Sequence, residues 1–255
     1  MADLTYPLTT AAAFLGGAIN SIAGGGTLLT FPSLLAVISP VAANATSTLA
    51  LLPGSFASAW GYREEIRGSR RILAMLFPPS LLGGILGALA VTRFPERVFE
   101  TLVPWLLLVA STLLVLQRPI ARWLGAHPHD APRGTTVAVI VFFQFLVGIY
   151  GGYFGAGIGI LMLSSLSFMG IPNINQMNGI KSVLAAVMNG VTAVIFALDE
   201  RVVWGYALPM AGASILGGYL AARTARRLPA QYVRTTVIVI GFAVAAYSFG
   251  SRASK

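Results

Sequence analysis

The chain has 255 residues, of which 56% are hydrophobic and only 10% are charged, and its mean hydropathy is +0.79. A soluble domain of this length carries roughly a quarter of charged residues, so the composition excludes an ordinary soluble domain and indicates an integral membrane protein. The net charge of +9 would suit nucleic acid, but the arginines fall mainly in short connections between apolar blocks, where they set topology and contact lipid headgroups. We therefore expect membrane lipid as a partner and no nucleic acid.

Apolar blocks recur along the whole sequence, and most are long enough for the ~20 residues that a spanning helix needs. They cover about 7–38, 42–61, 72–92, 98–117, 135–170, 175–198, 203–222 and 233–250. The first residues, MADLTYPLTTAAAFLGG, have no basic segment before the apolar run and do not resemble a cleaved signal peptide. The sequence predicts an all-α integral membrane protein, and we expect these first residues to belong to the mature chain.

An internal repeat divides the chain into two homologous halves. FLGGAINSIAGGG at 14–26 aligns with FLVGIYGGYFGAG at 145–157, at a spacing of 131 residues. SLLGGILGA at 80–88 aligns with SILGGYLAA at 214–222, and RFPERVFETLV at 93–103 with RLPAQYVRTTV at 227–237, both at a spacing of 134. Three agreeing registers indicate a duplication. We expect a first membrane repeat over 1–117, a cytoplasmic linker over 118–133 and a second membrane repeat over 134–255.

The arginines indicate how the two halves are oriented. Connection 62–71 has four arginines and its counterpart 199–202 has one, whereas 92–98 has two and its counterpart 223–234 has four. If the arginine-rich connections face the cytoplasm, the halves are inverted, which requires an odd number of crossings in each. Each half would then be a glycine-broken re-entrant hairpin plus three transmembrane helices, with 11 basic residues inside and five outside. A parallel arrangement with eight full spans gives ten against six.

We expect the inverted arrangement. It makes the protein a multi-pass protein of the bacterial inner membrane, with both termini on the periplasmic side.

Glycine clusters break the first block of each half, at Gly24, Gly25 and Gly26 and again at Gly155 and Gly157. Non-helical backbone inside a membrane must be buried in protein or line a cavity, so we expect the two tips in the interior. New helices should start at about Thr27 and Ile158, with their positive dipole ends exposed, and two such ends that meet form an anion site. The alternative is close packing of small residues, which we favour for Gly83, Gly84, Gly217 and Gly218.

Lys181 is the only ionisable residue well inside an apolar block. A charge at that depth is costly and by default functional: it can counter an anion, or it can release its proton and act as a coupling group. Snorkelling of the ammonium to a headgroup is the alternative. Side-chain donors accompany it at Asn20 and Asn178, and at Thr46 and Ser47 at the corresponding depth of the first half. A bond between helices is the alternative for each of these four.

Several function classes are excluded by missing residues. All eight acids fall in connections or near block ends, there is no cysteine, and His127 and His129 lie in the linker at a spacing unlike that of a metal motif. No catalytic set can be assembled. We expect no enzyme activity, no cofactor and no metal.

Three stretches resemble the sulfite exporter TauE/SafE family: GGAINSIAGGGTLLTFPSLLA, ANATSTLALLPGSFASAWGYR and MNGIKSVLAAVMNGVTAVIFAL. The resemblance extends from about 10 to 250. Residues 45–47, ATS, follow the small-hydroxyl pattern of the family, and the second half departs from it with IKS at 180–182. The resemblance implies a permease for sulfite, an organosulfonate or a related sulfur anion.

Together these observations predict a secondary transporter that moves a small sulfur-containing anion by alternating access around a mid-membrane site. The expected substrate-binding residues are Asn20, Gly24, Gly25, Gly26, Thr27, Thr46, Ser47, Gly155, Gly157, Asn178 and Lys181. The alternative is a scaffold protein that binds another membrane subunit through small-residue helix faces. A homodimer is a further candidate assembly.

Overall fold

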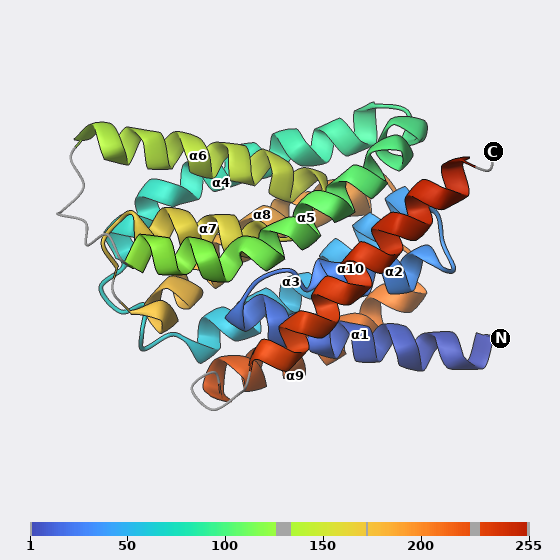
Figure 1. Ribbon diagram of the computed structural model, residues 1–255, viewed down its shortest axis with the longest axis horizontal. Helices are drawn as coiled ribbons and strands as arrows, with labels where there is room; N and C mark the ends of the chain where they lie inside the picture. The colour runs from blue at the N-terminus through green and yellow to red at the C-terminus, as the bar shows by residue number, and fades with distance from the viewer. Residues whose placement is uncertain (1, 126–133, 172, 225–229, 254–255) are drawn as a thin grey trace.

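The computed structural model describes residues 2–125, 134–171, 173–224 and 230–253, and over these ranges the fold consists of ten helices without any strand (Figure 1). The all-α prediction is confirmed. The helices are α1 Ala2–Ile22, α2 Thr27–Leu35, α3 Pro40–Gly61, α4 Arg70–Arg93, α5 Glu96–Gly125, α6 Gly134–Tyr153, α7 Ile158–Ser167, α8 Ile174–Leu198, α9 Trp204–Thr224 and α10 Ala230–Ala253.

Glycine turns produce a sharp reversal between α1 and α2 and another between α6 and α7. Gly24 and Gly25 have φ of 78° and 104°, and Gly155 and Gly157 have φ of 78° and 80°, values that a residue with a Cβ rarely adopts. Thr27 is the first residue of α2 and Ile158 the first of α7. The predicted starts of both short helices are confirmed.

The two hairpins extend to opposite ends of the molecule. In Figure 1, α1 and α2 reach from the centre to the right-hand end, where both termini lie, whereas α6 and α7 reach to the left-hand end. Between the halves, α1 packs on α9 and α6 packs on α4; α3 packs on α9 and α8 on α4; and α3 contacts α8 as α5 contacts α10. The contacts come in equivalent pairs, in which each helix is replaced by its counterpart five places along the chain. The pair α1 and α9 corresponds to α6 and α4, and the pair α3 and α9 corresponds to α8 and α4. Each half therefore packs its helices mainly against helices of the other half.

The boundary between the halves is less sharp than the sequence suggested. Helix α5 continues to Gly125, so residues 118–125, which we assigned to the linker, are helical. The rest of the linker, with His127 and His129, lies outside the described residues.

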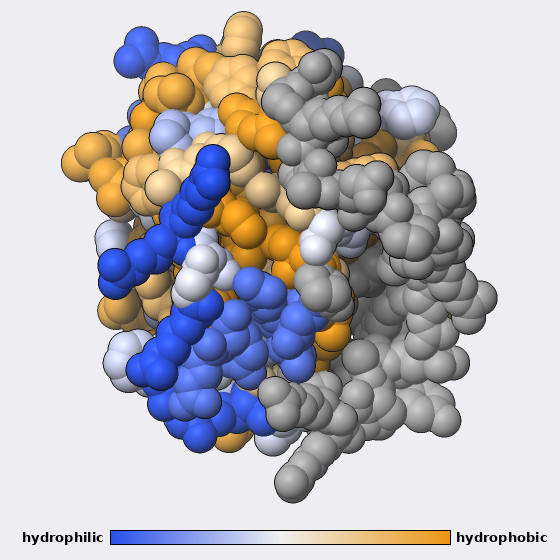
Figure 2. All heavy atoms as spheres, turned by 90° about the vertical axis from the view of Figure 1, so that its left-hand side faces the viewer, coloured by the Kyte–Doolittle hydropathy of each residue, from blue (hydrophilic) through white to orange (hydrophobic). Residues whose placement is uncertain are grey.

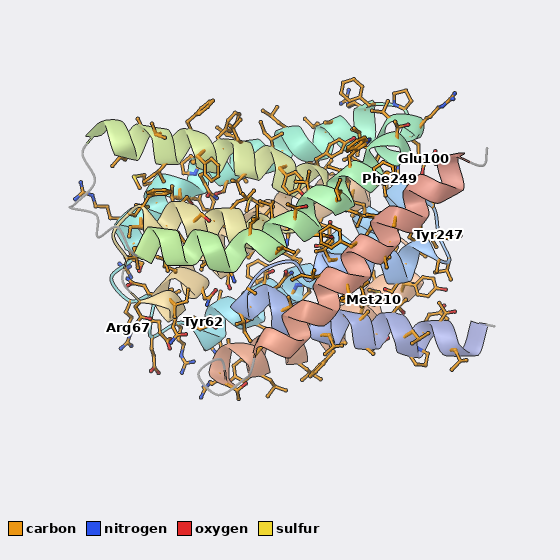
Figure 3. The ribbon with its side chains drawn as sticks, viewed as in Figure 1. Tyr62, Arg67, Glu100, Met210, Tyr247 and Phe249 are labelled. Atoms are coloured by element: carbon orange, nitrogen blue, oxygen red, sulfur yellow. The ribbon has the colours of Figure 1, made fainter. Side chains whose placement is uncertain are left out.

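The outer surface is apolar over most of the bundle. Among the described residues, two helices meet the length and composition expected of a membrane span, Arg70–Arg93 and Ile174–Leu198. Large apolar side chains are also exposed on other helices, for example those of Phe56, Trp60 and Phe142. Figure 2 shows hydrophilic side chains gathered on the end that lies at the left of Figure 1. Arg67 lies at this end and Glu100 at the other (Figure 3), so polar residues mark both ends of an apolar body, as lipid requires.

Glycines allow the helices of the two halves to approach closely. A Cβ at Gly217 of α9 would lie 1.9 Å from the carbonyl oxygen of Phe14 in α1, and a Cβ at Gly83 of α4 would lie 2.5 Å from that of Phe145 in α6. No side chain fits in these spaces, so both glycines have the packing role expected for them.

Replacing Gly217 by alanine should therefore destabilise the protein by about 1–3 kcal/mol, because the new methyl group must push α1 away from α9. Gly212→Ala is the matched control. It lies in the same helix with no atom within 4 Å of the added Cβ, and the better helix propensity of alanine should raise stability by up to ~1 kcal/mol. Thermal unfolding in detergent measures both. If both variants change the Tm equally, the close contact between α9 at Gly217 and α1 at Phe14 is wrong.

Candidate functional site

The tips of the two hairpins meet in the middle of the bundle. A Cβ at Gly24 would lie 2.6 Å from Cα of Gly159, and a Cβ at Gly159 would lie 2.7 Å from Cα of Gly24. The two backbones are therefore in direct contact, and any side chain at either position would separate them. The contact brings the first turn of α7 against the turn that precedes α2.

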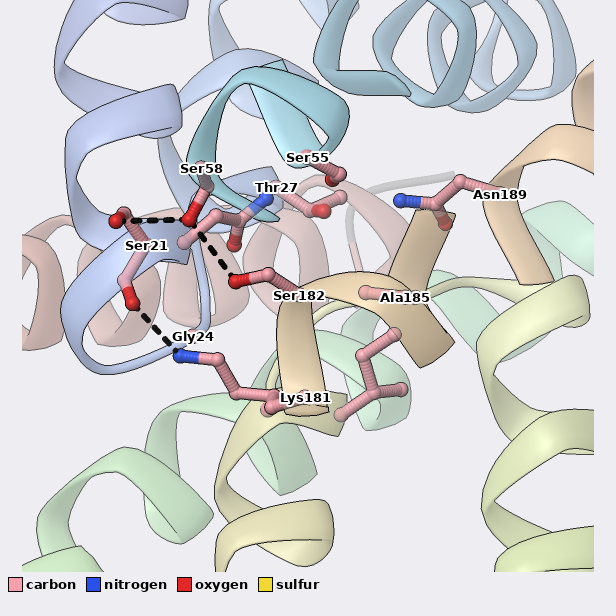
Figure 4. Close-up of a pocket in the computed structure, with 13 residues that line it drawn as sticks. Ser21, Gly24, Thr27, Ser55, Ser58, Lys181, Ser182, Ala185 and Asn189 are labelled. Atoms are coloured by element: carbon pink, nitrogen blue, oxygen red, sulfur yellow. Dashed lines mark hydrogen bonds between the residues drawn. The ribbon is translucent and has the colours of Figure 1, made fainter. Parts of the chain in front are cut away.

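Lys181 of α8 lies beside this contact and is 1% exposed. Its Nζ donates one hydrogen bond to the carbonyl oxygen of Ser21, at 3.1 Å, and another to Oδ1 of Asn178, at 2.8 Å. Both partners are acceptors, and a lysine ammonium has three donors, so one remains for a further acceptor. The bond to Ser21 joins α8 of the second half to the end of α1 in the first half (Figure 4).

Serine hydroxyls form a second link between the same helices. Ser58 of α3 donates to Oγ of Ser21 at 2.9 Å and lies 2.9 Å from the hydroxyl of Ser182 in α8 (Figure 4). Ser182 also donates to the carbonyl oxygen of Asn178. All of these side chains are buried. The network fixes α1, α3 and α8 around the ammonium of Lys181.

A small cavity of about 20 Å³ opens between these groups, with room for roughly one water molecule. Three pairs of its lining residues are separated by the repeat spacing: Gly24 and Gly155, Thr27 and Ile158, and Ser55 and Asn189. The cavity therefore lies where equivalent positions of the two halves face each other.

The charge around the cavity is positive. Lys181 is the only ionisable residue in its lining, which contains no carboxylate. The first residues of two helices, Thr27 of α2 and Ile158 of α7, also line it. Because helix N-termini carry partial positive charge, both helices add to the field of the ammonium. This arrangement favours an anion over a cation.

Five of the eleven residues predicted to bind substrate line the cavity. They are Asn20, Gly24, Thr27, Gly155 and Lys181. Asn20 has a second contact, since its Oδ1 accepts from the backbone N–H of Gly26 at 2.7 Å. That bond fixes the turn before α2 and occupies the N–H of Gly26, which we had expected to face the substrate.

The other six predicted residues lie outside the lining: Gly25, Gly26, Thr46, Ser47, Gly157 and Asn178. Oγ1 of Thr46 accepts from the backbone N–H of Val203 at 3.0 Å, and the hydroxyl of Ser47 pairs with that of Thr30 at 2.5 Å. The bond of Ser47 joins α3 to α2, which is the alternative that the sequence left open, and the bond of Thr46 joins α3 to the connection before α9. Asn178 contacts Lys181, whose ammonium donates to its Oδ1.

Eight residues outside the predicted substrate-binding set also line the cavity. They are Ser21, Ser55, Ser58, Ile158, Gly159, Ser182, Ala185 and Asn189. A signal was present on α8, where Asn178, Ser182, Ala185 and Asn189 are spaced by three or four residues and so share one face of the helix. Small and polar residues on one face of an apolar helix indicate the side turned toward the protein.

Comparison with known proteins gives a consistent assignment. Residues 9–248 match the family described as "Sulfite exporter TauE/SafE". A "Probable membrane transporter protein ORF9" of Sinorhizobium sp is 30% identical over 255 residues, covering 96% of this chain and 94% of the relative. The "Probable membrane transporter protein YfcA" of Escherichia coli K12 is 27% identical, covering 92% and 86%. A "Probable membrane transporter protein" of Haemophilus influenzae is 24% identical, covering 91% and 90%. The chain is therefore a membrane-integral transporter that belongs to the sulfite exporter TauE/SafE family.

Proposed function

We propose that the protein exports a small sulfur-containing anion, such as sulfite or an organosulfonate, across the bacterial inner membrane. The observation that carries this proposal is the ammonium of Lys181, buried at a cavity whose lining has no acid and includes the first residues of α2 and α7. A charge at this depth needs a functional reason, and an anion neutralises it. The class of anion comes from the name of the matched family.

The proposed topology is a pair of inverted repeats, each with a re-entrant hairpin, α1 with α2 and α6 with α7. Two observations support it: the hairpins extend to opposite ends of the molecule, and the helix contacts repeat when the halves are exchanged (Figure 1). Connection 62–69 lies at the left-hand end of Figure 1, and with the neighbouring first turn of α4 it contributes Arg63, Arg67, Arg70 and Arg71. We assign this end to the cytoplasm, which places both termini in the periplasm.

The proposed mechanism is alternating access. A cavity with room for roughly one water is too small for a sulfur oxyanion, so the hairpin tips in this conformation close the site. Separation of Gly24 from Gly159 would widen the cavity, and movement of one hairpin at a time would connect it to one side of the membrane only.

The small-residue faces give no support to a scaffold function. Gly217 and Gly83 are both covered by helices of this same chain, α1 and α6, and so are not available to another subunit. The exposed helix faces carry large side chains such as Phe56 and Phe142, which suit lipid.

Lys181→Met should lower sulfite flux in proteoliposomes by roughly 30-fold or more, because loss of a buried charged contact costs on the order of 2–5 kcal/mol. Folded yield should stay close to wild type, since methionine has no charge to bury. Thr92→Val, which removes a hydroxyl bonded only to its own helix α4, is the control and should keep full flux. Unchanged flux in Lys181→Met would remove this lysine from the mechanism.

Binding of the anion should raise the Tm of the wild-type protein in detergent, because a ligand of the folded state stabilises it in proportion to ln(1 + [L]/Kd). Sulfite, thiosulfate, sulfate and short sulfonates, compared at equal concentration and ionic strength, rank the substrates. Chloride at the same ionic strength is the control. Absence of a shift with all four anions would contradict an anion site.

Single cysteines test the topology, because the chain has none of its own. Leu4→Cys, at a position that is 72% exposed, and Gly250→Cys near the C-terminus should react with an impermeant maleimide in intact spheroplasts. Arg67→Cys, at the opposite end, should react only after permeabilisation. The reverse pattern would place the termini in the cytoplasm and overturn the assignment of sides.

A further inference from the structure

Two hydrogen bonds, one buried and one partly buried, connect the end of each hairpin's first helix to the opposite half of the chain. Nζ of Lys181 in α8 donates to the carbonyl oxygen of Ser21, in the last turn of α1. Nδ2 of Asn44 in α3 donates to the carbonyl oxygen of Tyr153, the last residue of α6, at 3.0 Å. Each acceptor directly precedes a glycine turn. Each bond therefore ties one hairpin to a helix of the opposite half, α1 to α8 and α6 to α3.

Asn44 has a counterpart beside Lys181, although the two donors are not themselves equivalent, because the repeat relates Lys181 to Ser47. Asn44 and Asn178 are separated by the repeat spacing of 134 residues, and Asn178 is the partner of Lys181. Asn44 is 1% exposed, and its Oδ1 has no hydrogen-bond partner in the part of the chain that the structure describes. The one hydrogen bond that the structure gives to the side-chain amide of Asn44 is thus the donation to Tyr153.

The two bonds differ in their relation to the cavity. Ser21 and Lys181 line it, whereas Asn44 and Tyr153 do not. An anion that enters must widen the cavity, which moves lining groups such as Ser21 and Lys181 apart, and it offers the ammonium a charged acceptor, which is a stronger partner than the neutral carbonyl. The bond from Asn44 to Tyr153 lies outside the cavity lining, so neither the widening of the cavity nor the charge of the anion acts on it directly. Anion binding should therefore loosen the first hairpin and leave the second in place.

We propose that Asn44 is a positioning residue that holds the α6–α7 hairpin while the anion releases the α1–α2 hairpin from Lys181. This proposal rests on the proposed anion site. The α1–α2 hairpin extends to the end of the molecule where both termini lie (Figure 1), so the cavity opens toward that end when the anion is bound. Asn44 acts through the position of the hairpin and not by contact with the anion.

Hydrogen exchange of the wild-type protein in detergent, with and without sulfite, tests the order of release. Sulfite should raise the exchange rate of amides in 20–30 by about fivefold to tenfold, the effect of one lost hydrogen bond, and leave those in 151–160 unchanged. A rise in 151–160 alone, or in both segments equally, would overturn the proposal.

Asn44→Leu tests the positioning residue directly, without any anion. Leucine has nearly the same shape but no donor. It removes a buried oxygen that has no partner but leaves the carbonyl oxygen of Tyr153 without its donor, so we expect a Tm slightly below that of wild type. Exchange in 151–160 should nevertheless rise by about fivefold, and Kd for sulfite should stay within threefold of wild type. Ser47→Ala is the matched control: it removes a buried bond from the same helix, but to Thr30 of the same half, and exchange in 151–160 should not change.

The outcomes separate this proposal from the proposed function. If sulfite raises the Tm but changes exchange in neither hairpin, the anion site stands and the release of the first hairpin is wrong. If exchange in 151–160 is unchanged in Asn44→Leu, the role of Asn44 is wrong whether or not an anion binds. If no sulfur anion stabilises the protein, the anion site fails, and the exchange data for Asn44→Leu still decide how the second hairpin is held. Should Asn44→Leu not fold, the wild-type comparison alone can overturn the proposal.

Discussion

The contact between the backbones of Gly24 and Gly159 is the constraint on which the rest of the structure depends. Two helices that enter a bundle from opposite ends can meet tip to tip only where neither has a side chain. The glycine turns supply the reversal, and the contact then places the first residues of α2 and α7 on one small volume. Because this volume is enclosed, the partial charges of the helix ends and of a single ammonium act there with little screening. The proposed anion site would then be a consequence of this packing.

Burial of Lys181 shows how such a charge is tolerated. An ammonium away from water needs acceptors for its protons, and in this fold they come from the carbonyl of Ser21 and the side chain of Asn178. The carbonyl belongs to the opposite half, so the group that would bind the substrate also joins the two halves. A transporter needs this coupling between ligand and conformation, since a ligand shifts an equilibrium only through contacts that differ between the two states.

Part of the candidate site could be predicted from the sequence. What made a residue recognisable differs from one residue to the next. Lys181 was found because a lysine in an apolar helix has few explanations, and the glycine clusters because they recur at a fixed spacing. Ser21 and Ser58 were not, because serines are frequent in membrane helices and a single serine does not say which face of its helix is turned inward. Ser47 corresponds to Lys181 by the repeat, yet its hydroxyl pairs with Thr30, away from the cavity. A repeat predicts equivalent backbone positions, and the side chains there can still face different neighbours.

The all-α membrane class, the duplication, the starts of the two short helices at Thr27 and Ile158, and one lysine inside an apolar helix can be read from the amino-acid sequence. These are local or periodic properties, which composition, glycine and hydrophobic pattern encode directly. The contacts of Gly24 with Gly159, of Lys181 with Ser21 and of Asn44 with Tyr153 are visible only in the folded protein. Each of these contacts joins residues more than a hundred positions apart, and their proximity depends on how all ten described helices pack together.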